Sequence, residues 1–145
     1  MIVVVATDEE YKVAKERFKG KKIIKTGVGG INVIQALRKI PKWKRIINFG
    51  YCGSDTITIG TEVRIGFCKH YHNIQYEEPV FELGRQDDYY LCLTSDEFVE
   101  EGINMQNTVY DMELAYICAL GFKHIESIKI VSDNLSLKEY EENIG

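Results

Sequence analysis

Residues 109–134, which read VYDMELAYICALGFKHIESIKIVSDN, predict a helix followed by a strand and decide the fold. Apolar side chains recur at the spacing of one helix face, and Gly121 is placed to end that helix. The positions on this face are Val109, Met112, Tyr116, Ala119 and Leu120. A strand is then expected over about 125–131, and Ser132-Asp133-Asn134 ends it.

Two carboxylates stand out in this unit because of where they lie. Glu113 lies on or beside the apolar face of the expected helix, and Asp133 follows the strand. In open α/β sheets, ligands bind at the carboxyl ends of strands. Other interpretations remain open, since Asp133 could cap a following helix and Glu113 could be an ordinary exposed residue.

The rest of the chain alternates between strand and helix signals. The run at 2–6 is apolar throughout and β-branched at 2–5, as in a parallel strand that is buried on both faces. Further strands are expected at about 22–25, 45–49, 57–65 and 90–93, and helices at 9–18, 31–40 and 135–144. Residues 74–88 are largely polar and acidic and predict a surface connection. We therefore expect one α/β domain over 1–145, with a mixed, mostly parallel central sheet flanked by helices in three layers.

Composition and charge exclude several classes of protein. The chain has 45% hydrophobic and 28% charged residues, as soluble globular domains do, and no apolar run of membrane length. Residues 1–45 hold 12 Lys and Arg against 4 Asp and Glu, but these basic residues alternate with apolar ones, so we expect no nucleic-acid partner. The four cysteines form no CxxC pair, which favours reduced thiols in a cytoplasmic protein.

Two other kinds of ligand site are disfavoured by spacing. The glycines at 27, 29 and 30 lack the GxGxxG spacing of a dinucleotide site, although a glycine turn before a helix can hold a phosphate. His70 and His72 would share one face of a strand, but no third ligand is evident. The sequence therefore predicts no cofactor and no metal.

The order of the motifs resembles the nucleoside phosphorylase/nucleosidase superfamily. Within it, Asp111-Met112-Glu113 followed by Ser132-Asp133 is most similar to the methylthioadenosine/S-adenosylhomocysteine nucleosidases. The resemblance implies that Met112 lies against a ribose, that Glu113 holds the ribose hydroxyls and that Asp133 protonates a purine leaving group. It also implies that the last residue of the acidic cluster after the first strand, Glu10, activates water, with Glu9 as the alternative.

Other segments extend this resemblance along most of the chain. The turn at Gly27 looks like the glycine turn at the edge of the family's site, and Tyr51-Cys52-Gly53 like the segment beneath base and sugar. Phe98 would stack on the purine, with Val99 at the edge of the base, or Phe98 could be a core aromatic. Phosphorylases of the superfamily hold phosphate with an Arg and a Ser where this chain has Asn48 and Tyr51. Water is therefore the expected nucleophile.

The resemblance implies hydrolysis of the N-glycosidic bond of a purine nucleoside. Three alternatives are a phosphate-dependent phosphorylase, a non-catalytic nucleoside- or nucleotide-binding module, and a nucleosidase for an unusual base or for a nucleotide whose 5′-phosphate meets the basic first half. The chain is shorter than typical members, with shortened connections at 11–25 and 66–90 and a shortened closing helix. Exposed core would then need cover, so a homo-oligomer, dimeric or larger, is expected.

Overall fold

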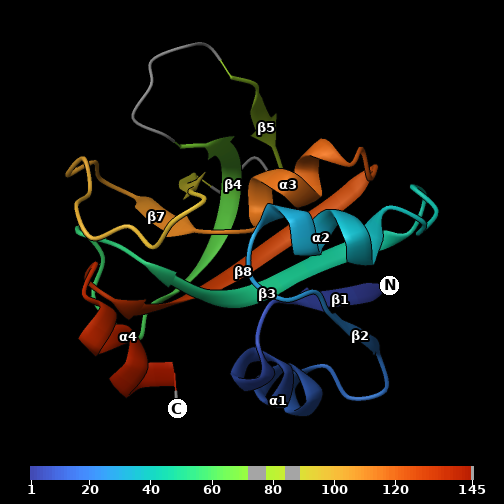
Figure 1. Ribbon diagram of the computed structural model, residues 1–145, viewed down its shortest axis with the longest axis horizontal. Helices are drawn as coiled ribbons and strands as arrows, with labels where there is room; N and C mark the ends of the chain where they lie inside the picture. The colour runs from blue at the N-terminus through green and yellow to red at the C-terminus, as the bar shows by residue number, and fades with distance from the viewer. Residues whose placement is uncertain (72–77, 84–88, 145) are drawn as a thin grey trace.

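The computed structural model describes residues 1–71, 78–83 and 89–144, and it is a mixed α/β fold with helices on both sides of a central sheet (Figure 1). The strands are β1 (Ile2–Val5), β2 (Lys22–Lys25), β3 (Arg45–Gly53), β4 (Glu62–His70), β5 (Val80–Glu82), β6 (Tyr90–Thr94), β7 (Thr108–Asp111) and β8 (His124–Asp133). The helices are α1 (Asp8–Arg17), α2 (Gly30–Leu37), α3 (Leu114–Ala119) and α4 (Leu137–Ile144). The predicted fold class is confirmed.

The sheet of the described residues bends until part of it closes. Strands β2, β1 and β3 pair in parallel, and β3 continues in parallel to β8. Strand β8 pairs with β4, β4 with β6, β6 with β7, and β7 returns to β3 through the register pair Gly53 and Tyr110. Five strands therefore form a closed ring, while β2 and β1 extend it on one side and β5 pairs with β4.

Strand β1 shows how the sequence directs the helices to the two faces of the sheet. Its side chains alternate across the sheet, as in any strand. Val3 and Val5 pack in a cluster with Ala14 of α1, whereas Ile2 and Val4 pack in a cluster with residues of α2 and α3. The continuous apolar run at the start of the chain therefore fills two separate cores.

The helix that was expected to include residue 109 begins five residues later. Thr108–Asp111 form strand β7, which pairs in parallel with β6, and α3 starts at Leu114. Val109 and Tyr110 have the β-branched and aromatic side chains that suit a strand, and their ladder partners lie far away in sequence. The prediction that Val109 belongs to a helix face was therefore wrong. Met112 and Glu113 lie in the turn between β7 and α3.

The surface connection predicted at 74–88 contains a short strand. Val80–Glu82 form the short strand β5, antiparallel to β4, where the sequence predicted a surface connection. A strand of three residues with exposed ends leaves little periodic signal. His72, and with it the predicted histidine pair, lies outside the described residues.

Several features are missing from the described part of the chain. Its four cysteines are buried and form no disulfide. No described helix has the length and apolar character needed to cross a membrane. Among the same residues, no group of three or more His, Cys, Asp or Glu side chains is placed to hold a metal ion.

Candidate functional site

A pocket of about 240 Å³ lies where β1, β3 and β8 end. We call it the main pocket; its lining comprises Ala6, Thr7, Glu10, Val28, Tyr51, Cys52, Gly53, Phe98, Tyr110, Asp111, Met112, Glu113, Asp133 and Tyr140. A recess of about 30 Å³ adjoins it and shares the lining residues Gly53, Phe98, Tyr110, Asp111, Met112 and Asp133. Glu97, Val99 and Leu135 line the recess alone. The carboxyl edge of the sheet therefore carries a hollow with two connected parts.

Asp133, the last residue of β8, lines both parts of this hollow. Its Oδ2 accepts a hydrogen bond from the Leu135 N–H at 3.0 Å, and its Oδ1 accepts one from the Ser132 hydroxyl at 2.9 Å. Burial raises the pKa of Asp133, although both hydrogen bonds oppose the shift. The carboxyl group therefore holds a proton more readily than an exposed aspartate does.

Gly53 of β3 gives the Asp133 side chain its room. A Cβ atom on Gly53 would lie 2.7 Å from Asp133 Oδ2 and 3.0 Å from Leu135 Cδ2. Such distances require neighbouring atoms to move, so any larger residue at position 53 would displace the carboxyl group. Gly53 belongs to the segment that was predicted to lie beneath base and sugar. The close approach of Asp133 and Leu135 explains why a glycine stands at this position.

Glu113 is held by the glycine turn before α2. Its Oε2 accepts a hydrogen bond from the Gly29 N–H at 2.9 Å, and its side chain is largely buried. Burial, together with the negative charge of Asp111, raises the pKa of Glu113 to about 8, although the positive charge of Lys129 opposes the shift. Glu113 therefore holds a proton more readily than an exposed glutamate does.

This raised pKa predicts a pH dependence of stability that the Glu113→Gln variant isolates. The folded protein binds a proton on Glu113 between the ordinary glutamate pKa of 4.5 and about 8, where the unfolded chain does not. Stability contributed by Glu113 is therefore present below pH 4.5 and lost as pH rises toward 8. The free energy of unfolding of wild type, relative to Glu113→Gln, should fall from pH 5 to pH 8, by at most about 1.4 kcal/mol per pH unit. Urea denaturation at each pH measures it, and a flat difference would contradict the raised pKa.

Glu10 lies in the first turn of α1 and serves its start as well as the main pocket. Its Oε1 accepts hydrogen bonds from the N–H groups of Ala6 (2.8 Å) and Thr7 (3.2 Å), and the Thr7 hydroxyl accepts from the Glu10 N–H. This capping box fixes the helix start. Its Oε2 accepts from the Tyr51 N–H at 2.8 Å, which ties α1 to β3. Glu9, the alternative, does not line the pocket in the described structure.

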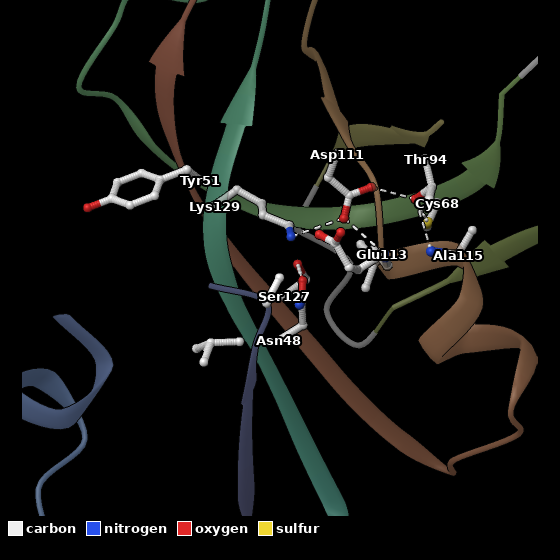
Figure 2. A network of polar contacts seen from close by, with 12 residues as sticks. Asn48, Tyr51, Cys68, Thr94, Asp111, Glu113, Ala115, Ser127 and Lys129 are labelled. Atoms are coloured by element: carbon white, nitrogen blue, oxygen red, sulfur yellow. Dashed lines mark hydrogen bonds and ion pairs between the residues drawn. The ribbon is translucent and has the colours of Figure 1, made fainter. Parts of the chain in front are cut away.

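A buried ion pair beneath the pocket was missed by sequence reasoning (Figure 2). Lys129 of β8 is 1% exposed, and its Nζ lies 3.1 Å from Asp111 Oδ2. Asp111 also accepts hydrogen bonds from the Thr94 hydroxyl (2.5 Å) and the Leu114 N–H (2.8 Å). Burial alone would raise the pKa of Asp111, but Lys129 and these hydrogen bonds hold that pKa below its ordinary value. Asp111 therefore orients the start of α3 and hence the turn that carries Glu113.

The structure places the remaining predicted site residues in three groups. Met112, Phe98, Tyr51, Cys52 and Gly53 line the main pocket, and Val99 lines the recess. Ser132 does not line the hollow, but its hydroxyl contacts Asp133 and the Cys52 carbonyl. Gly27 is not in the lining either; its neighbours Val28 and Gly29 provide the contacts of that turn.

Tyr140 of α4 is a second lining residue that sequence reasoning missed. Its ring packs edge-on against the ring of Phe98, with the centroids 5.7 Å apart. Tyr140 is the aromatic residue of the short, charged helix α4. An aromatic side chain among charged ones was the sequence signal that could have identified it. Lys129 had a clearer signal, because it interrupts a buried strand and lysine is almost never buried without a partner.

No protein-family model and no curated protein matches the sequence. Among solved structures, the methylthioadenosine/S-adenosylhomocysteine nucleosidase of Neisseria meningitidis in complex with methylthio-immucillin-A aligns with a TM-score of 0.79 and 17% identity, over 99% of this chain and 90% of that one. The chain has the fold of these nucleosidases. The S-adenosylhomocysteine nucleosidase of Streptococcus pyogenes (TM-score 0.78, 17% identity, 99% and 89% covered) shows the same similarity.

A solved structure of a differently named hydrolase also aligns with this chain. Futalosine hydrolase of Helicobacter pylori strain 26695 aligns with a TM-score of 0.76 and 13% identity, over 99% of this chain and 89% of that one. The resemblance to the superfamily predicted from the motifs is therefore confirmed at the level of fold. The main pocket of this chain lies at the carboxyl edge of its sheet.

Proposed function

We propose that this protein hydrolyses the N-glycosidic bond of a purine nucleoside. The observation that carries the proposal is that Glu10, Glu113 and Asp133, from three separate segments, line one pocket. Carboxyl groups are the groups that glycoside hydrolysis requires, because its transition state resembles an oxocarbenium ion and needs both a proton donor and a base. Methylthioadenosine is the first substrate to test, since the similar proteins are named for it.

Asp133 supplies the proton to the leaving base. A purine leaves poorly until one of its ring nitrogens is protonated, so the acid must hold a proton near neutral pH. The raised pKa of Asp133 supports this role. The recess beside Asp133, lined by Phe98, Val99 and Gly53, takes the base edge.

Glu113 and Glu10 act on the sugar side of the bond. Glu113 binds the ribose hydroxyls, and the positive charge that develops on the sugar lowers the pKa of Glu113 again and favours its ionised form. This stabilisation is stronger in the transition state than in the ground state, so it raises the rate. Glu10 orients a water molecule through the lone pairs that its backbone donors leave available. Met112 packs against the sugar.

Two of the alternatives lack support at this pocket. Among the described residues that line it there is no Lys or Arg, so neither inorganic phosphate nor a 5′-phosphate would meet an exposed cation there. Asn48, at the position of the phosphorylases' Arg, is buried and accepts a hydrogen bond from the Ser127 hydroxyl at 2.8 Å. Tyr51 fills the second position with an aromatic ring. Water is therefore the proposed nucleophile.

The test is base release from a panel of purine nucleosides by the wild-type protein, with and without inorganic phosphate. We expect release at the same rate in both conditions, because the pocket offers phosphate no cationic ligand. A rate that requires phosphate would identify a phosphorylase. Binding without release from any nucleoside, measured as a rise in melting temperature, would identify a non-catalytic binding module.

A further inference from the structure

Tyr140 lines the main pocket and carries a hydroxyl group that the proposed reaction does not use. Among the described residues, this hydroxyl makes no hydrogen bond, although the ring is half-buried. Burial and the nearby charges of Glu10 and Glu113 raise the pKa of Tyr140 to about 12. The phenol is therefore neutral, and its O–H is available as a donor.

The position of this side chain is fixed by the way α4 is attached. The Asn134 side chain donates hydrogen bonds to the carbonyl groups of Ser54 (2.7 Å) and Ile57 (2.9 Å), which anchors the segment between β8 and α4. The Ser136 hydroxyl accepts from the Glu139 N–H at the start of the helix. The Tyr140 ring then packs against Phe98 at 5.7 Å. The Tyr140 ring is thus a fixed part of the pocket wall.

The proposed orientation of the nucleoside puts its sugar, rather than its base, beside Tyr140. It lines the main pocket, which also holds Glu10 and Glu113, and it does not line the recess beside Val99. Asp133, which would protonate the base, lies where the two parts join. A nucleoside with its base toward the recess therefore has its sugar beside Tyr140.

The chemistry of the sugar decides which atom this donor serves. The 2′ and 3′ hydroxyls are assigned to the carboxylate of Glu113, which accepts hydrogen bonds. A donor on the ring oxygen would withdraw the electron density that stabilises the oxocarbenium-like state. Among the acceptors of the sugar, the one that remains is a group on the 5′ carbon. An oxygen there accepts a hydrogen bond well, whereas a thioether sulfur is a weak acceptor.

We propose that the Tyr140 hydroxyl makes this site select nucleosides that carry an oxygen on the 5′ carbon. This inference rests on the proposed function and adds to it the class of 5′ substituent. It places 5′-hydroxyl nucleosides above their 5′-deoxy and 5′-methylthio counterparts. Tyr140 is a specificity residue in this reaction, since it contacts a part of the substrate at which no bond changes.

The experiment compares kcat/KM for adenosine, 5′-deoxyadenosine and 5′-methylthioadenosine in wild type and Tyr140→Phe. Wild type should prefer adenosine over 5′-deoxyadenosine by about fivefold to tenfold, the effect of one neutral hydrogen bond. In Tyr140→Phe, which keeps the ring contact with Phe98, this ratio should fall to about one. The loss should appear in KM for adenosine, with 5′-deoxyadenosine unaffected.

Glu141→Gln is the matched control, because Glu141 is the exposed neighbour of Tyr140 on the same helix, and its ratio should equal that of wild type. An unchanged ratio in Tyr140→Phe, at an unchanged melting temperature, would overturn the inference while leaving the hydrolase intact. A wild type without preference for the 5′ oxygen would also overturn it. Absence of release from all three nucleosides and from the wider purine panel would overturn the proposed function, and the preference with it.

Discussion

The Asp133→Asn variant is expected to release base about 10³-fold more slowly than wild type, the middle of the range for loss of a general acid. The amide keeps the size of the carboxyl group and can still accept the Leu135 N–H. It cannot deliver a proton to the purine, however. The loss should therefore appear in kcat, with KM little changed, and the measurement is initial-rate adenine release over a range of substrate concentrations.

Glu126→Gln is the control for this variant, since it changes a carboxylate to an amide on the same strand, far from the pocket. Glu126 lies near the start of β8 and pairs with Arg45 at 3.3 Å in a partly exposed position. We expect its rate to match that of wild type. If Asp133→Asn keeps its rate within tenfold of wild type, another group protonates the base, and the assignment of the acid is wrong.

The sequence predicted the parts of the site that depend on local signals. Asp133 follows an apolar run and Ser132, so its place at a strand end could be inferred from neighbours alone. Glu10 lies three residues after Thr7, which is the spacing of a capping box. The glycine turn before α2 was also visible, although its contact to Glu113 comes from Gly29 rather than Gly27.

The parts that were missed depend on strand pairing between distant segments. Val109 and Tyr110 fit a helix face until the ladder with β6 and the closure of the ring at Gly53 are known. The burial of Lys129 is likewise decided by Asp111, which lies on another strand of the ring. Periodicity describes one segment at a time, so it cannot show which charged residue will find a partner.

Replacing Lys129 by Met is expected to lower the free energy of unfolding by about 3–5 kcal/mol, the cost of removing one partner from a buried ion pair. Methionine keeps an unbranched apolar stem as long as that of lysine and lacks only the ammonium group. Asp111 then keeps its hydrogen bonds from Thr94 and Leu114 but loses its cation. Urea denaturation of wild type and variant at pH 7 measures the difference.

The double variant Lys129→Met with Asp111→Asn is the control, and it remains informative if Lys129→Met fails to fold. It removes both charges and leaves no buried ion without a partner, so it should be more stable than Lys129→Met alone.

The pH dependence of stability gives an independent check of the role of the Lys129 charge. In wild type, the pKa of Asp111 is held below its ordinary value, so its contribution is present above that value and lost as pH falls. Without Lys129, burial raises this pKa instead, so the deficit of Lys129→Met relative to wild type should shrink as pH falls toward 4. A deficit that is independent of pH would mean that packing, rather than the charge on Asp111, makes Lys129 necessary.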